Sequence, residues 1–269
     1  MSIVSLTSDY GWKDPDAGAL RGRLYTEMLR HQVAAPVVDI SHDVMPRNHQ
    51  EGGYILRGAY QDFPKGSVHI LLVDCRPNPE YQIMAAEING HYFLLQDHGG
   101  LSLLFPNQKP RQCVLVDLKN RLDLHEPGAI MCAAAAHLIA GGQINTLGPP
   151  RQPSNELKSL MPTVHSVNEA TVHVQYIDHF GQVVTNASDA WLQEWHKGTR
   201  LIAHVRHQRI SKWDENLSTD FEAGELFLRM NDRGFLEIGI RWPGDHGVNS
   251  AANLLGLNLQ DPITLRSEP

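Results

Sequence analysis

The amino-acid sequence predicts an α/β protein in two parts. An N-terminal Rossmann-like domain with a largely parallel sheet is expected over residues 1–150, and a small C-terminal β-barrel over residues 151–269. Predicted strands alternate with predicted helices through the first half, which is typical of a parallel sheet with helices on both faces. The second half contains short apolar runs separated by polar turns, which indicates an all-β domain.

The elements of the first domain follow from the spacing of apolar residues. The longest apolar run, 129–140, contains His137 and is too short to span a bilayer, so we expect a buried helix there. Residues 82–88 and 91–95 form a predicted hairpin. The other predicted strands are 3–6, 37–40, 68–73 and 112–118, and the other predicted helices are 17–30 and 50–59.

A turn-rich linker is predicted between the two domains. Residues 144–164 carry four prolines and few large apolar side chains. Six short strands are expected after it, at 172–177, 182–184, 200–205, 226–230, 235–240 and 263–265.

Composition excludes several classes of partner. The formal net charge is −7 without a basic block, which argues against nucleic acid because phosphate binding needs clustered Lys and Arg. The three cysteines lack CxxC spacing, so we expect a reduced, cytoplasmic compartment. No cationic region precedes an apolar stretch at the N-terminus, so neither a signal peptide nor a membrane partner is expected.

Carboxylates follow two of the predicted strands. Asp9 comes where the first strand ends, with Gly11 permitting a tight turn, and Asp74 follows the strand at 68–73. Ligands bind at the carboxyl ends of strands in open α/β sheets, and a carboxylate there can accept two hydrogen bonds from a ribose diol. The alternative is that Asp9 or Asp14 caps the helix beginning near residue 16.

His42 follows the strand at 37–40 and admits two interpretations. It could ligate a metal, but no partner lies nearby at ligand spacing, and His125-Glu126 is not followed by a histidine at the zinc-protease spacing. We therefore expect a hydrogen-bonded histidine at the strand end and no metal.

The segment Ser8-Asp9-Tyr10-Gly11, followed by Asp14, Gly18 and Arg21-Gly22, resembles the opening motif of the S-adenosylmethionine hydroxide adenosyltransferases. These are hydrolytic relatives of the fluorinases and chlorinases. Further blocks in the family's order extend the resemblance from about residue 3 to about residue 260, at 37–54, 71–77, 95–102, 176–186, 231–238 and 249–257.

The resemblance implies an α/β domain followed by a small β-barrel, and hydrolysis of S-adenosyl-L-methionine to adenosine and L-methionine. Water would attack the ribose C5′, with no metal or other cofactor. It also implies a homotrimer, in which the α/β domain of one subunit and the β domain of the next share a site.

Asp74 is by resemblance the residue that holds and polarises the attacking water. Halogenating relatives carry tyrosine there, so Asp74 favours water over halide. The family's Gly-rich segment is replaced by residues 75–79, and Tyr81 takes the place of an arginine. Arg76 is the candidate for the missing charge, and the alternative is a surface residue paired with Glu80.

His125 resembles the family histidine that contributes to the water site, although the Gly-Arg-Asp that follows in the family is lost here. The alternative is a solvated loop histidine. Arg47 replaces an aromatic residue that walls the site in halogenating relatives, so it would make that wall polar.

The block at 176–186 implies roles in substrate binding. Asp178, with help from Asp14, would bind the methionyl ammonium. Phe180 would lie against adenine, unless it is a barrel-core aromatic. Gln182 replaces an asparagine that reads the adenine edge, and an amide keeps both donor and acceptor.

Asp232 and Arg233 fall where relatives hold the methionine carboxylate, and of the two Arg233 suits an anion.

Two other functions stay open. The altered segment at 75–81 is compatible with a non-catalytic adenosine or S-adenosylmethionine binding protein. Halide adenosyl transfer is the other, and Asp74 opposes it because a carboxylate repels an anionic nucleophile.

Overall fold

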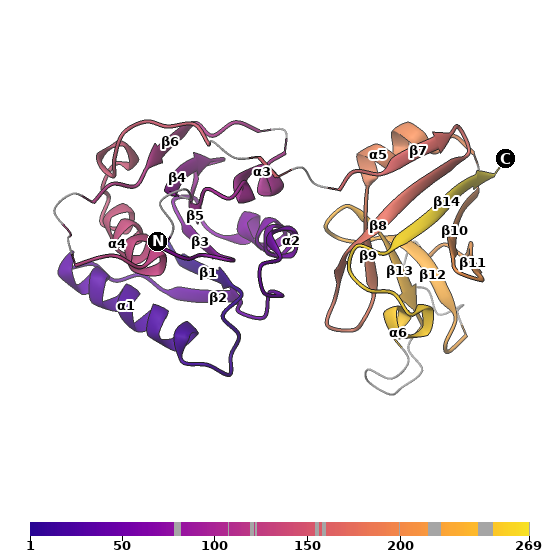
Figure 1. Cartoon of the computed structure of the whole chain (residues 1–269), viewed down its shortest axis with the longest axis horizontal. Helices are drawn as coiled ribbons and strands as arrows, with labels where there is room; N and C mark the ends of the chain where they lie inside the picture. Colours follow the sequence, from indigo (N-terminus) through magenta and orange to yellow (C-terminus); the bar gives the residue numbers. More distant parts are fainter. Residues whose placement is uncertain are drawn as a thin grey trace. The chain divides into compact units, whose positions relative to one another are not determined.

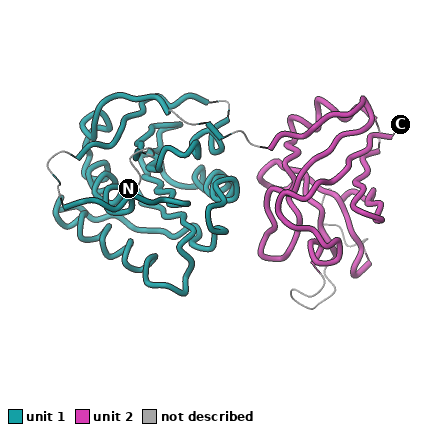
Figure 2. Tube along the Cα trace, in the orientation of Figure 1, with its two compact units in different colours: residues 1–159 teal, residues 160–269 magenta. Residues whose placement is uncertain are grey.

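The computed structural model describes residues 1–77, 82–106, 108–118, 121, 123–153, 156–157, 160–198, 200–214, 222–241 and 250–268. The chain divides into two compact units, residues 1–159 and 160–269 (Figure 2). Within the described ranges, no helix has both the length and the apolar character needed to cross a membrane.

The first unit contains a six-stranded sheet in the order β2-β1-β3-β5-β4-β6 (Figure 1). Neighbouring strands β2, β1, β3 and β5 run parallel, and β4 alone opposes its neighbours β5 and β6. The largely parallel sheet and the predicted hairpin, β4–β5, are therefore confirmed. The strands are β1 (Val4–Ser8), β2 (Val37–Ser41), β3 (Val68–Leu72), β4 (Ile83–Ile88), β5 (His91–Gln96) and β6 (Gln112–Leu115).

Helices cover both faces of this sheet (Figure 1). Because side chains alternate along a strand, Ile70 and Leu72 of β3 pack with α1 and α4, whereas Leu71 and Val73 pack on the face of α2 and α3. The helix expected at 129–140 is confirmed and is almost entirely buried. The helices are α1 (Asp16–Arg30), α2 (His49–Ala59), α3 (Gly100–Leu104) and α4 (Pro127–Ile139), with short 3₁₀ helices at Tyr60–Asp62 and Ile144–Thr146.

The connections around β1 position a site. The chain leaves β1 through α1 to reach β2 on one side, then returns through α2 to β3 on the other side. Since α1 and α2 lie on opposite faces, the carboxyl ends of β1 and β3 meet at a topological switch point, where open α/β sheets bind ligands.

The second unit is an antiparallel barrel in the order β11-β10-β14-β8-β9-β13-β12, with β7 on β8. Residues after β11 close it, because Leu228 of β12 exchanges backbone hydrogen bonds with Lys212 and Asp214. The six predicted strands are confirmed as β8 (Glu169–Ile177), β9 (Val183–Ser188), β10 (Arg200–Val205), β12 (Leu226–Met230), β13 (Phe235–Ile240) and β14 (Pro262–Glu268), and β7 (Thr163–Ser166), β11 (Gln208–Ile210), α5 (Asp189–Trp195) and α6 (Ala251–Leu255) accompany them.

The segment predicted as a linker begins inside the first unit. Ile144 and Leu147 are buried in the core beneath α4, and Leu115 of β6 donates its backbone N–H to the carbonyl of Pro149. Prolines remove backbone donors, but they do not prevent neighbouring apolar residues from packing.

Candidate active site

Asp9 connects three strand ends at the switch point. Its Oδ2 atom accepts hydrogen bonds from the backbone N–H of Arg47, after β2, at 2.9 Å and of Asp74, after β3, at 3.0 Å. The alternative that Asp9 or Asp14 caps α1 is wrong, because the N-cap is Pro15 and no side chain caps the helix. Asp14 lies exposed in the bend before α1.

The Asp74 carboxylate lies close to two arginine side chains. Its Oδ1 atom lies 2.5 Å from Nη2 and 3.1 Å from Nε of Arg76, and 3.6 Å from Nε of Arg47. Burial alone would raise the pKa of Asp74. The hydrogen bond and charge of Arg76, together with His49 and Arg47, lower that pKa overall. The carboxylate is therefore ionised at neutral pH and is a weak base.

Arg76 reaches Asp74 because its backbone is fixed by Gln96 at the end of β5. The buried Gln96 side chain accepts from the Arg76 N–H at 3.1 Å and donates to the Arg76 carbonyl at 2.8 Å. The alternative partner, Glu80, lies outside the described residues, as does Tyr81. In the described residues Arg76 therefore pairs with Asp74.

Arg76 and His125 line one cavity of about 360 Å³. Gln96 lies on its wall, while Ile83 and Ile130 supply apolar surface. His125 itself is exposed, in the loop just before α4. The structure thus brings together two of the three predicted catalytic residues at this cavity, and Arg76 contacts the third, Asp74.

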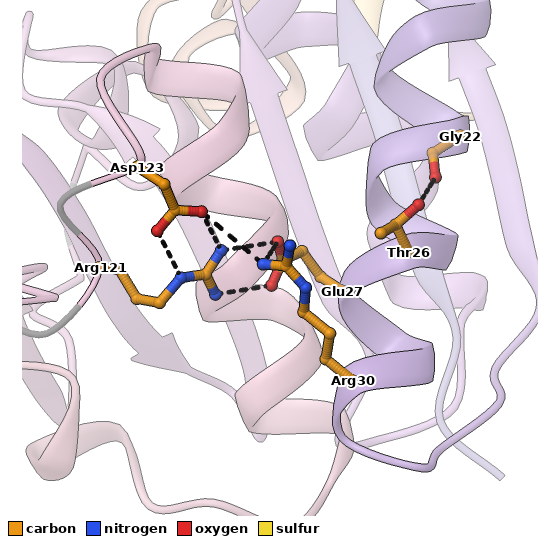
Figure 3. Close-up of polar contacts among 6 residues, drawn as sticks. All are labelled: Gly22, Thr26, Glu27, Arg30, Arg121 and Asp123. Atoms are coloured by element: carbon orange, nitrogen blue, oxygen red, sulfur yellow. Dashed lines mark hydrogen bonds and ion pairs between the residues drawn. The ribbon is translucent and has the colours of Figure 1, made fainter.

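A charged network holds the segment that leads to His125 (Figure 3). Arg121 donates two hydrogen bonds, at 2.8 and 2.9 Å, to Glu27, a buried residue of α1, and two more, both 2.9 Å, to Asp123. Arg30 also pairs with Glu27 at 2.9 Å. The hydrogen bond from Arg121 lowers the pKa of Glu27, so this buried carboxylate stays charged and paired.

Two histidines near Asp74 were not predicted as site residues. The rings of His49, at the start of α2, and His98, after β5, lie 5.0 Å apart. Burial lowers the pKa of both, so both are neutral at neutral pH. Each follows a strand that ends at this edge of the sheet, which is the sequence signal that could have identified them.

His42 is hydrogen-bonded as expected. Its buried ring lies between the Ser8 hydroxyl, 2.6 Å from Nδ1, and Asp39, 2.9 Å from Nε2. Arg21 continues the network to Asp39 at 3.0 Å. In the described part of the chain, no group of three or more His, Cys, Asp or Glu residues is arranged to hold a metal ion.

In the second unit, Asp178 organises a turn between β8 and β9. Its Oδ1 atom accepts from the N–H of Phe180 at 2.9 Å and of Gln182 at 2.7 Å. Burial raises the pKa of Asp178 despite these bonds. Phe180 is 54% exposed, so the alternative that it is a barrel-core aromatic is wrong.

The remaining predicted binding residues lie at the two opposite ends of the β12–β13 hairpin, Gln182 beside Ile240 and Asp232 and Arg233 in the turn. Gln182 uses its Oε1 atom to accept from the N–H of Ile240 at 2.9 Å, so its Nε2 amide group is what remains for a ligand. Asp232 and Arg233 are exposed in the β12–β13 turn, where Asn231 accepts from the Arg233 N–H at 3.0 Å.

Sequence reasoning also missed a buried carboxylate that interacts with Asp178, paired with a half-buried arginine. Glu237 of β13 is 3% exposed and accepts from Arg229 of β12 at 2.7 Å. Burial, assisted by the charge of Asp178, raises the pKa of Glu237. The charge of Arg229 acts in the opposite direction and lowers the pKa of both Glu237 and Asp178.

Comparison with known proteins identifies the family. Residues 4–148 match the S-adenosylmethionine (SAM) hydroxide adenosyltransferase N-terminal domain, and residues 172–264 match its C-terminal domain. Two curated proteins named (R)-S-adenosyl-L-methionine hydrolase are similar over nearly their whole length. The one from Methanocaldococcus jannaschii is 24% identical (98% of this chain, 96% of that protein), and the one from Salinispora tropica is 26% identical (97% and 96%).

Two solved structures share the fold. An uncharacterized conserved protein from Thermotoga maritima has a TM-score of 0.81 at 24% identity, covering 98% of this chain and 99% of that one. A conserved hypothetical protein from Thermus thermophilus has a TM-score of 0.71 at 21% identity, covering 99% of both chains. Since the N-terminal match alone spans more than half of the sequence, the chain belongs to the SAM hydroxide adenosyltransferase family.

Proposed function

We propose that the protein hydrolyses S-adenosyl-L-methionine to adenosine and L-methionine. It acts on the R epimer, which is the one in the names of its curated relatives. The observation that supports this most is the ionised Asp74 carboxylate at the carboxyl end of β3. Asp9 holds its backbone and Arg76 pairs with its side chain.

The reaction balances without a resident cofactor. A water oxygen forms a bond to C5′ of the ribose while the C5′–S bond breaks, and the bonding pair leaves with sulfur as the neutral thioether of methionine. The water releases a proton to solvent. A sulfonium is already an activated leaving group, so the departing sulfur needs no acid.

Asp74 would orient and polarise the water rather than store its proton. A carboxylate with a lowered pKa is a poor proton acceptor, but it still accepts a strong hydrogen bond from water. In this proposal His125 contacts the same water from the cavity that it lines with Arg76. Alignment of the water with C5′ and sulfur lowers the barrier further.

The binding residues divide the substrate among them. Asp9 has Oδ1 for a ribose hydroxyl, and Arg47 forms a polar wall. In this proposal the exposed Phe180 stacks on adenine, and the Gln182 amide group donates to its edge. Asp178 and Asp14 suit the methionyl ammonium and Arg233 its carboxylate, whereas Asp232 does not suit that anion.

We also propose a homotrimer in which residues of both units, from neighbouring subunits, complete one site. Mixing inactive Asp74→Asn with inactive Asp178→Ala under conditions that exchange subunits tests this. A shared site recovers part of the activity. No recovery despite demonstrated exchange means that each subunit acts alone.

The function itself is tested by incubating the purified protein with S-adenosyl-L-methionine and separating the products. Hydrolysis predicts adenosine and methionine in equal amounts, strongly reduced in Asp74→Asn and retained in Asp43→Asn. Asp43 is a matched control because it is an exposed aspartate on the neighbouring β2–α2 loop. A protein that only binds the substrate gives no product, and a halide transferase gives a halogenated nucleoside in chloride.

A further inference from the structure

The backbone at Asp74 and Arg47 adopts a conformation that is uncommon for residues other than glycine. Asp74 has φ of 50° and Arg47 has φ of 66°, both in the left-handed region. Glycine enters this region freely and aspartate tolerates it, but for arginine it is unfavourable. Such positions persist only where the surroundings hold them, and they concentrate at functional sites.

Backbone pairing between the strands ends before these two positions, and Arg47 lies in a local turn in which the Asn48 N–H bonds to the carbonyl of Met45 at 2.9 Å. Asp9 N–H bonds to the carbonyl of Leu72 at 3.2 Å, and Val44 N–H bonds to that of Ser8 at 3.3 Å. Beyond these bonds, the side chain of Asp9 supplies the next connection across the strand ends. It reaches both left-handed residues with the same oxygen.

We propose that Asp9 is a positioning residue, which holds Asp74 and Arg47 in their left-handed conformations through their backbone N–H groups. This inference deepens the proposed function, because Asp74 is the residue that would orient water there. A carboxylate suits the task, since a charged acceptor makes stronger hydrogen bonds than a neutral one and can serve two donors.

The two carboxylate oxygens of Asp9 have different roles. Oδ2 is committed to the two N–H groups, so Oδ1 alone remains for the ribose. Asp9 therefore acts on catalysis through Asp74 and on binding through the sugar. Its removal should lower kcat as well as raise KM, whereas a residue that bound only the sugar would leave kcat at saturation unchanged.

Residue-resolved hydrogen exchange of the ligand-free protein tests the two backbone hydrogen bonds without any ribose present. The amides of Arg47 and Asp74 should be protected in the unmodified protein. They should exchange at least tenfold faster in Asp9→Ala, faster by a smaller factor in Asp9→Asn, whose neutral amide oxygen is a weaker acceptor, and at an unchanged rate in Asp43→Asn. Asp9→Asn retains the size of the side chain, so it serves if Asp9→Ala does not fold.

Steady-state kinetics provide the second readout. Once the acceptor for these two N–H groups is removed, kcat at saturating S-adenosyl-L-methionine should fall at least tenfold in Asp9→Ala, fall by a smaller factor in Asp9→Asn, and stay unchanged in Asp43→Asn. Free exchange of the two amides in the unmodified protein, continued protection in both Asp9 variants, or an unchanged kcat would each overturn the inference. If the unmodified protein does not turn over the substrate, the proposed function fails, and the exchange data alone decide whether Asp9 holds the two backbones.

Discussion

Two aspartates, one in each unit, use one carboxylate oxygen to bind two backbone N–H groups, but over different separations along the chain. Asp9 binds residues 38 and 65 positions away, whereas Asp178 binds residues two and four positions away. The arrangement around Asp9 thus depends on the assembled sheet, and that around Asp178 on a local turn. The first can change when distant segments move, while the second is largely self-contained.

The two arrangements also differ in backbone strain. The Asp9 hydrogen bonds end on Asp74 and Arg47, which are left-handed without being glycine, whereas the left-handed residue in the Asp178 turn is Gly181, with φ of 73°. Glycine adopts this conformation without a steric penalty. Of these two arrangements, the one around Asp9 therefore carries the strain, beside the proposed reacting group, and we expect Asp74 to govern rate and Asp178 to govern binding.

The largest expected effect follows from removing the charge that orients water. Asp74→Asn should lower the rate of adenosine formation by about 10²–10⁴-fold, the range of general-base contributions, and leave the affinity for adenosine nearly unchanged. Stopped assays and calorimetry measure the two quantities. Undiminished turnover would remove Asp74 from the mechanism and erase the contrast between the units.

A smaller effect is expected from Asp178→Asn. Asparagine keeps a side-chain oxygen for the Phe180 and Gln182 N–H groups, so the turn should survive while the charge is lost. Losing a charged hydrogen-bond partner corresponds to about 1.5–3 kcal/mol, so affinity for S-adenosyl-L-methionine should fall roughly 10–100-fold.

Adenosine lacks the ammonium group and is the internal control for this variant. Its dissociation constant, measured by the same titration, should stay within about twofold, an expectation that rests on the intact turn. Equal weakening of both ligands would mean that Asp178 acts through the turn and not through its charge.

The sequence predicted the local arrangement better than the assembled one. The predicted strands at 172–177 and 182–184 leave a short turn between them, and the Asp178 hydrogen bonds in that turn span at most four residues. Asp9 and Asp74 were also found, because both follow apolar strands. That Asp9 would bind the backbone of Asp74 was not predictable, because it depends on the register of β1 against β3.

Other misses have similar causes. The rings of His49 and His98 come from α2 and the end of β5, and they meet only when the sheet is formed. The helices α5 and α6 were missed because they have only seven and five residues, too few to show a helical period. Ser188 and Ser250 cap them, however, and serine at this position is a typical signal of a helix start.

A pH profile of activity tests whether the ionised form of Asp74 is required. The pKa of Asp74 is lowered, so an activity that needs the ionised form is present above that value and is lost as pH falls through it. Arg76→Gln removes the guanidinium that lowers this pKa, so the acid limb of kcat/KM should move to higher pH. Circular dichroism at each pH distinguishes titration from unfolding, and an unmoved limb in the folded variant would contradict the assignment.

The smallest effect concerns strain. Arg47→Gly removes the cost of a left-handed arginine, which is about 1–2 kcal/mol. Glycine also makes the unfolded chain more flexible, which lowers the free energy of unfolding by about 0.4–1 kcal/mol. The net free energy of unfolding should therefore rise by roughly 0.5 kcal/mol. Gly181→Ala should do the opposite, because its Cβ would lie 2.3 Å from Cβ of Ser250. Denaturant titration measures both, and a stabilising Gly181→Ala would contradict the comparison of the two turns.

Water, oriented by Asp74, is the group that we propose displaces methionine from C5′. Incubation with S-adenosyl-L-methionine in ¹⁸O-labelled water, followed by mass spectrometry of the products, tests this most directly. Attack by water predicts adenosine carrying one ¹⁸O at the 5′ position, methionine without label, and little of either product from Asp74→Asn. Adenosine without label, or a nucleoside carrying another group at C5′, would contradict it.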